Sequence, residues 1–362
     1  MLRAVHPSPP PPTASPPPTA PPCIPVSSWT DAQLAAETVI VPAQETAVGA
    51  VSSAVASGAG GVILFGSTAP ADLGSQIAAI EAAVPGRLGL LVMTDEEGGG
   101  VQRMANLVGS LPWASYMGAN WTPAEITAQV AAVARGMAQY GVNMDLAPVV
   151  DVDGRNVPPG PTDPDGWRSF SGSTSVVTAD GIAYMSGLEE GGVIPVLKHF
   201  PGLGGASGNT DNGTATTLPW MTLQTVGLPP FTAAIQDGAP AIMVSNAVVP
   251  GLTQLPASLS TVAITDELVG TLHFDGLILT DSLSAGAISD AGFSVTSAAV
   301  QAIVTGADMV MYTSASDAAA LQQFQAIVDA DVAAVGNGSL ALGRLVAAAA
   351  AALTARHLNV CP

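Results

Sequence analysis

From about residue 30 to its C-terminus, the chain alternates short apolar runs with longer segments of helical pattern. Strand followed by helix, repeated without a break, indicates a parallel sheet, and continuous apolar strands indicate burial on both faces. The expected strands are 60–66, 88–95, 141–151, 192–200, 240–247, 276–281 and 307–313. The expected helices are 70–84, 122–140, 178–190, 222–237, 262–273, 294–306, 316–334 and 338–357.

Seven or eight such repeats in 362 residues predict an α/β protein with a single TIM-type (β/α)8 barrel over residues 26–362. An open doubly wound sheet is the alternative architecture. No G-x-G-x-x-G follows the first expected strand, so the commonest cofactor signature of that alternative is absent from the sequence.

Residues 1–25 form a tract rich in Pro, Ser, Thr and Ala, which we expect to be a disordered, extended linker. Cys23 lies near the end of this tract, and Cys361 is the penultimate residue of the chain. The two ends of a barrel meet, because the last helix packs beside the first strand, so a Cys23–Cys361 disulfide is geometrically reasonable. Two unpaired thiols are the alternative.

A disulfide would place the protein in an oxidising compartment, so we expect it to be extracellular or associated with the cell envelope. The opening "MLRAV" is not the apolar segment of a signal peptide, which leaves a cytoplasmic protein as the alternative. No run reaches the roughly 18 apolar residues of a membrane-spanning helix.

The net charge of −19 argues against binding to nucleic acid or to anionic membrane surfaces, and it does not penalise neutral ligands such as sugars. We therefore expect a small-molecule or oligosaccharide substrate and a monomeric protein.

Polar side chains follow nearly every expected strand. In barrel enzymes the site is built at the carboxyl ends of the strands, so these groups are expected to converge on one mouth. Each acid taken alone could instead cap the next helix. The strand-end residues are Asp95, Asp145, Asp151, Lys198, His199, Ser245, Asn246 and Asp281.

Lys198 is the only lysine of the chain, and it lies beside one of four histidines. A lone ammonium among converging carboxylates can donate to sugar hydroxyls. The alternative is a lysine that merely extends to solvent, beside a histidine that is hydrogen-bonded in the core. Arg103 and Arg168 belong to two further strand-end loops and would bring cations to the same mouth, unless they form ordinary surface ion pairs.

Six motifs in this order resemble the N-terminal barrel domain of glycoside hydrolase family 3, particularly its single-domain β-N-acetylhexosaminidase-like members. They are "TDEEGGGVQRM", "APVVDVDG", "WRSFS", "KHFPGLG", "TDSLSAGAI" and "GADMVMY". The resemblance covers about residues 30–350. It implies release of terminal β-linked sugars through a covalent glycosyl-enzyme, with no metal or cofactor.

The resemblance further implies that Asp281 is the nucleophile, which neighbouring cations would keep ionised. It assigns sugar binding to Asp95, Arg103, Arg168, Lys198 and His199. A retaining glycosidase also needs a second group, about 5 to 5.5 Å from the nucleophile, that protonates the leaving oxygen.

The proton donor is where the sequence departs from the family. The hexosaminidase-like members carry Asp-Ser-His on the loop after "KHFPG", whereas this chain has Asn209-Thr210-Asp211. Asp211 replaces the histidine as acid/base if the loop buries it enough to keep it protonated; otherwise it only caps a turn. Further carboxyl candidates are Glu96, Glu97, Asp151 and Asp153. The alternative function is a weakened or inactive homologue that binds sugar or peptidoglycan.

Overall fold

A computed structural model describes residues 23–361, so the expected linker over 1–25 lies almost wholly outside the described residues. The strands are β1 (Val39–Gln44), β2 (Gly61–Phe65), β3 (Leu91–Thr94), β4 (Glu96–Gly98), β5 (Val101–Gln102), β6 (Met144–Asp145), β7 (Ile194–Pro195), β8 (Leu197–Phe200), β9 (Ala241–Val244), β10 (Leu277–Thr280) and β11 (Val310–Met311).

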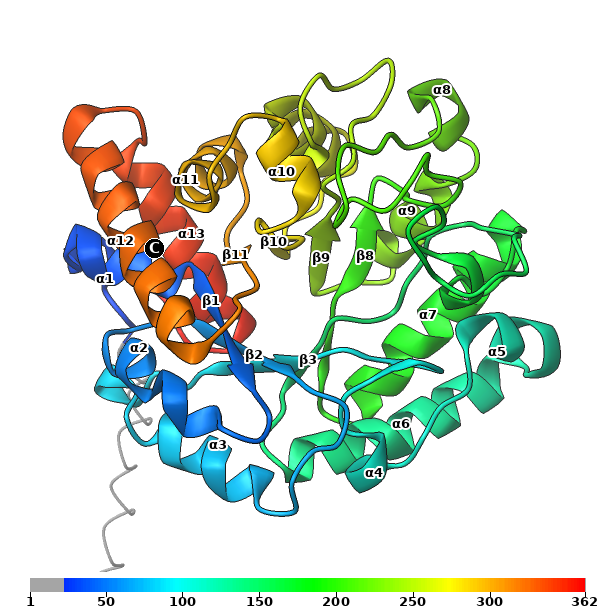
Figure 1. Ribbon diagram of the computed structural model, residues 1–362, viewed down its shortest axis with the longest axis horizontal. Coiled ribbons are helices and arrows are strands. Elements are labelled where there is room, and N and C mark those ends of the chain that lie inside the picture. The colour runs from blue at the N-terminus through cyan, green and yellow to red at the C-terminus, as the bar shows by residue number, and fades with distance from the viewer. Residues whose placement is uncertain (1–22, 362) are drawn as a thin grey trace, which may run out of the picture.

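The α-helices surround these strands in Figure 1. They are α1 (Asp31–Glu37), α2 (Ser52–Ala56), α3 (Leu73–Glu81), α4 (Ala105–Val108), α5 (Ala114–Asn120), α6 (Pro123–Gln139), α7 (Thr174–Glu190), α8 (Trp220–Leu223), α9 (Leu228–Gln236), α10 (Gly286–Asp290), α11 (Val295–Thr305), α12 (Asp317–Asn337) and α13 (Leu342–Ala355). None of the described helices is both long and apolar enough to span a lipid bilayer.

The strands close into a parallel ring, which confirms the predicted barrel. Parallel pairs link β11, β1, β2, β3, β6 and β7 in that order, and β8, β9 and β10 form a second run. Only Val196 separates β7 from β8, and a parallel bridge from Leu279 to Met309 joins β10 to the start of β11. Within residues 23–361 the ring therefore has eight strand positions, with β7 and β8 sharing one.

The strands bury side chains on both faces, which explains their unbroken apolar sequences. Along β2, Ile63 belongs to the cluster that fills the barrel, whereas Val62 and Leu64 pack outward against the helices. Methionines contribute to the interior as well, with Met93 and Met144 facing each other across the β3–β6 pair. The barrel is thus a packed core that supports a site at its rim.

The observed elements depart from the expected ones at several places. Strand β1 was not predicted from the sequence. The expected helix at 222–237 is two helices, because α8 ends at Leu223 and α9 begins at Leu228, with two prolines in its first turn, where proline is tolerated. The expected helix at 262–273 is a π-helix over Val262–Thr271.

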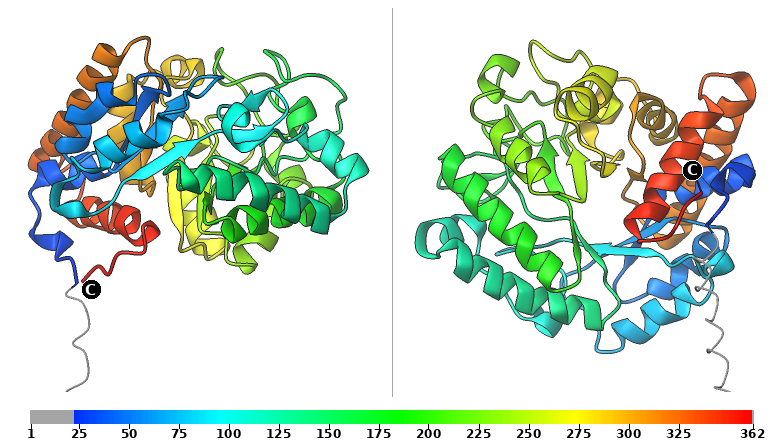
Figure 2. Two further views of the ribbon diagram at one scale, coloured as in Figure 1. Left: turned by 90° about the horizontal axis from the view of Figure 1, so that it is seen from below. Right: turned by 180° about the vertical axis from the view of Figure 1, so that it is seen from behind.

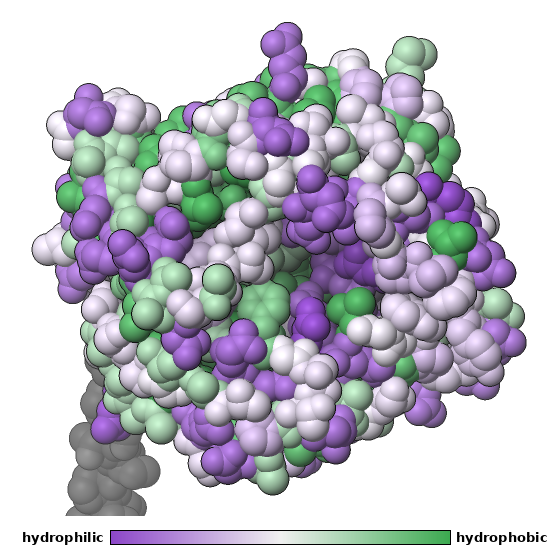
Figure 3. All heavy atoms as spheres, viewed as in Figure 1, coloured by the Kyte–Doolittle hydropathy of each residue, from purple (hydrophilic) through white to green (hydrophobic). Residues whose placement is uncertain are grey.

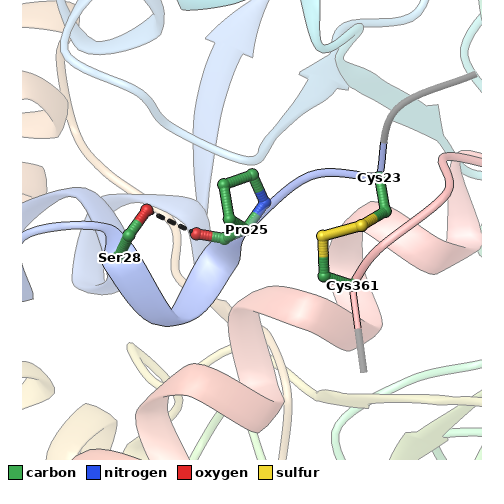
Figure 4. Close-up of a disulfide and its surroundings, with 4 residues drawn as sticks. All are labelled: Cys23, Pro25, Ser28 and Cys361. Carbon is green, nitrogen blue, oxygen red and sulfur yellow. Dashed lines mark hydrogen bonds between the residues drawn. A yellow bond between two sulfur atoms is a disulfide. The ribbon is translucent and has the colours of Figure 1, made fainter.

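The two ends of the described chain lie together (Figure 2). Ile24 forms a parallel bridge with Val360. A disulfide joins Cys23 to Cys361 beside this bridge (Figure 4). The bond fastens the start of the barrel to the segment that follows α13.

Candidate active site

The seven residues to which we assigned catalytic or sugar-binding roles all border one cavity of about 330 Å³ at the carboxyl ends of the strands. Figure 3 shows this face hollowed near its centre, with hydrophilic side chains gathered in the hollow. The barrel brings together groups from chain positions almost two hundred residues apart. They are Asp95, Arg103, Arg168, Lys198, His199, Asp211 and Asp281.

Lys198 lies on β8 and is only 3% exposed. Its Nζ atom is 3.0 Å from Oδ1 of Asp95 and 2.6 Å from Oε1 of Glu97. Burial alone would lower the pKa of the Lys198 ammonium, but the charges of Glu97 and Asp95 outweigh it and the pKa is raised. The lysine is therefore a fixed cation at the base of the cavity, and it does not extend to solvent.

Glu97 connects the lysine to Arg168. Its carboxylate accepts hydrogen bonds from Nε of Arg168 at 2.8 Å and from Nη2 at 2.9 Å. Burial would raise the pKa of Glu97, but Arg168 and Lys198 together hold it well below its usual range. Sequence reasoning named Glu97 only as one of several further carboxyl candidates, because nothing local shows that it bridges two cations.

Arg103 reaches the cavity from the segment after the β4–β5 hairpin. Its Nη2 atom is 3.4 Å from Oδ2 of Asp95, so that Asp95 contacts both Arg103 and Lys198. Glu96 instead accepts hydrogen bonds from the backbone N–H groups of Arg103 and Met104, at 2.7 and 2.9 Å. Burial raises the pKa of Glu96 to about 7, and its contacts give it a structural role in closing the hairpin.

His199 is held by Asp151 behind the cavity wall. Nδ1 of His199 lies 2.7 Å from Oδ2 of Asp151, and this oxygen also accepts from the backbone N–H of His199, while Oδ1 of Asp151 accepts from that of Leu203. Burial, followed by the charge of Arg168, lowers the pKa of His199 to about 4. A neutral imidazole that donates from Nδ1 leaves Nε2 as an acceptor for a sugar hydroxyl.

Asp165 lies beside this pair, and its ligand atom is within 4.8 Å of those of Asp151 and His199. Three such groups could hold a metal ion in principle. Burial and the charge of Asp151, in that order, raise the pKa of Asp165 well above its usual value. A protonated carboxyl at Asp165 can donate to the neighbouring carboxylate of Asp151, which would account for two buried acids lying side by side.

Asp281 follows β10 directly and faces the cavity. Its Oδ1 atom accepts a hydrogen bond from the backbone N–H of Ser282 at 2.7 Å. We expected neighbouring cations to keep this carboxyl ionised. Burial is the larger effect and raises the pKa of Asp281, although the interactions with His199, the backbone N–H of Ser282 and Lys198 counteract part of the shift.

Asp211 borders the same cavity but is exposed to solvent. Its backbone N–H donates to Oδ1 of Asn209 at 2.9 Å, so the side chain that caps this turn is that of Asn209, whereas our alternative had given that role to Asp211. The carbonyl groups of Thr210 and Asp211 accept from Ala287 and Gly286 at the start of α10. Asp153, a further candidate from the sequence, is paired with Arg155 outside this cavity.

Strand-end carboxylates and cations that surround one sugar-sized cavity in a barrel are the arrangement expected of a barrel glycoside hydrolase. Residues 36–352 match the glycosyl hydrolase family 3 N-terminal domain, and the chain belongs to this family.

Relatives support this placement. The chain is 36% identical over 272 residues to the β-hexosaminidase LpqI of Mycobacterium tuberculosis, covering 72% of this chain and 68% of that one. A secreted glycosyl hydrolase of Arthroderma benhamiae is 33% identical over 78% of this chain and 80% of its own. The solved β-N-acetylhexosaminidase of Beutenbergia cavernae superposes with a TM-score of 0.82 at 29% identity, covering 91% of this chain and 99% of that one. The protein is therefore a β-N-acetylhexosaminidase-like glycoside hydrolase.

Proposed function

We propose that the protein is a retaining exo-β-glycosidase that releases a terminal β-linked sugar, with Asp281 as the nucleophile. In the first step the carboxylate of Asp281 attacks the anomeric carbon and the glycosidic C–O bond breaks, while an acid protonates the leaving oxygen. In the second step water, deprotonated by the same group, attacks the glycosyl-enzyme and releases the sugar. The placement of Asp281 in one cavity with Lys198 carries this proposal.

The ion-pair network is suited to hold the terminal sugar. Asp95 and Glu97 fix Lys198, Arg103 and Arg168 in place, so that little side-chain freedom is lost when hydroxyls bind. A cavity of about 330 Å³ is at the low end of ligand sites, which favours the end of a sugar chain over its middle. The relatives' names make an N-acetylhexosamine the first sugar to test, and we choose glucose as the second.

For the proton donor we propose Asp211, which occupies the position of the family's histidine and borders the cavity. The bound sugar would cover the carboxyl and exclude water from it. We further propose that the protein works outside the cytoplasm, because the Cys23–Cys361 disulfide suits an oxidising compartment and one relative is a secreted enzyme.

The decisive experiment is mass spectrometry after incubation with a 2-deoxy-2-fluoro-glucoside and, because that compound lacks the 2-acetamido group, with a 5-fluoro glycoside of N-acetylglucosamine. We expect a glycosyl adduct on Asp281 and loss of aryl glycoside turnover in Asp281→Asn. The exposure of Asp211 favours a second candidate function, sugar binding without catalysis. That candidate predicts saturable binding that depends on Lys198, with no adduct and no turnover of any aryl glycoside, and this result would refute the first proposal.

A further inference from the structure

Aromatic side chains are rare in this chain, at 4% of residues, yet several of them gather in one place. Trp113, Tyr116, Trp167 and Phe170 border a second cavity of about 560 Å³. The side chain of Tyr116 is 53% exposed, and both tryptophans keep part of their surface accessible. Exposed aromatic side chains that gather in one place indicate a binding site, because a chain with so few aromatic residues would otherwise bury them.

The second cavity adjoins the active site. Residues Gly166–Arg168 form a single turn of 3-10 helix. In this turn Trp167 borders the second cavity, and the next residue, Arg168, borders the first and binds Glu97. One turn of backbone therefore serves as a wall between the two cavities.

The two indole rings are held rigidly. Nε1 of Trp167 donates to Oδ1 of Asn156 at 2.7 Å. Trp113 lies against Gly99, where an added Cβ would be 2.0 Å from its ring. This contact explains part of the triple glycine of "DEEGGG". The ring centroids of Trp113 and Trp167 are 6.0 Å apart at an interplanar angle of 56°. Rings already fixed in place lose little entropy when they bind.

The chemistry around the rings suits a neutral, hydroxyl-rich ligand. Arg155 is paired with Asp153 at 3.0 Å and with Asp163 at 2.8 Å. The two carboxylates neutralise the arginine, so the cavity offers no net positive charge that would attract a phosphate or carboxylate ligand. The Arg155 side chain is still 41% exposed and can donate further hydrogen bonds, and Asn120 offers an amide nearby. The face of a pyranose ring carries weakly positive C–H groups, which are attracted to the negative face of an indole.

We propose that the cavity formed by Trp113, Tyr116 and Trp167 binds further units of a β-linked oligosaccharide whose end occupies the active site. This inference rests on the proposed function for the identity of the ligand, but it does not depend on turnover. It names the substrate class: chains of several sugar units are bound better than simple glycosides. The small first cavity takes the terminal unit, and the aromatic cavity takes part of the remainder.

The test uses full-length Asp281→Asn protein and isothermal titration calorimetry with chitotetraose and, in a separate arm, cellotetraose. We expect Trp113→Ala combined with Trp167→Ala to weaken binding of the preferred tetrasaccharide at least about tenfold. Tyr116→Ala, at an exposed position that is safe for folding, should weaken it several-fold. Trp220→Ala, which changes a half-buried tryptophan outside both cavities, is the matched control and should bind as the parent does.

Binding of either tetrasaccharide that is unaffected by both the double variant and Tyr116→Ala overturns the inference, and so does the absence of binding of both sugars. The proposed function is judged separately, by the glycosyl adduct and turnover in protein with Asp281 intact. If the protein turns over glycosides but the aromatic variants bind tetrasaccharides as the parent does, only the proposed binding site in the aromatic cavity is refuted. Binding that depends on Trp113 and Trp167 without turnover supports the second site and removes the catalytic proposal.

Discussion

Asp331, in the middle of α12, is fully buried, and neither carboxyl oxygen has a hydrogen-bond partner within the described residues. Burial raises its pKa to about 7 from an ordinary value of 3.8. Each unit of difference is worth about 1.4 kcal/mol, so the difference of about three units corresponds to about 4 kcal/mol. Below about pH 4 the carboxyl is protonated in both the folded and the unfolded state, and the difference has no effect on stability.

As the pH rises from 4 to 7, the unfolded chain loses the proton of Asp331 while the folded protein keeps it, so the folded state is progressively destabilised. Above about pH 7 the full penalty of about 4 kcal/mol is present. Asp331→Asn removes this titration. We therefore expect the stability of the variant relative to the parent to increase between pH 4 and pH 8 by up to about 4 kcal/mol.

The assay is urea denaturation followed by circular dichroism at pH 4, 6 and 8, with the disulfide intact. Asp329→Asn is the control, because Asp329 lies on the same helix but is exposed and accepts a hydrogen bond from Gln325. Its stability relative to the parent should hardly change with pH. A difference between Asp331→Asn and the parent that is the same at pH 4 and pH 8 would refute the reasoning that burial shifts this carboxyl.

Three further predictions concern the site and the chain ends. Glu97→Gln should destabilise the fold by about 3–5 kcal/mol in urea unfolding and raise KM, because two buried cations lose their shared carboxylate; unchanged values of both would contradict the role of the bridge. Asp211→Asn should move the acid limb of kcat/KM to lower pH for an aryl glycoside with a good leaving group, because the charge of Asp211 raises the pKa of Asp281; a limb that does not move would count against their interaction. Cys23→Ser with Cys361→Ser should lower Tm, because the disulfide restricts the unfolded chain; for a separation of 338 residues the entropic contribution to the free energy of unfolding is at most about 6 kcal/mol. Equal Tm values for variant and parent would show that the bond does not stabilise the fold.

The barrel could be predicted because most strands are apolar runs bounded by Gly or polar residues, which local sequence reveals. Strand β1 could not, because Pro42 in "VIVPAQ" argues against a central strand. The ladder explains why it is tolerated. Strand β1 pairs with β11 through Val39 and Ile40 only. Pro42 comes after these pairs, so its lack of an N–H removes no hydrogen bond between β1 and β11.

The three consecutive acids Asp95, Glu96 and Glu97 show what sequence reasoning missed in the site. Alternate residues of an extended segment point to opposite sides. Asp95 and Glu97 accordingly both contact Lys198, whereas Glu96 faces the backbone of Arg103. The short strand β4 creates this alternation, but it pairs only with β5 in a hairpin that the sequence did not indicate. Had the hairpin been predicted, Glu97, which bridges two cations, could have been distinguished from Glu96, which has a structural role.

The position of Asp211 depends on the segment that follows Asp281. Thr210 and Asp211 accept backbone hydrogen bonds from Ala287 and Gly286, at the start of the helix five residues after Asp281. A Cβ at Gly286 would lie 2.6 Å from the backbone nitrogen of Gly213, so only glycine allows this contact. A proton donor needs a fixed place and a water-poor environment. The contact with α10 supplies the place, and we expect the sugar ring bound over Asp281 to exclude the water.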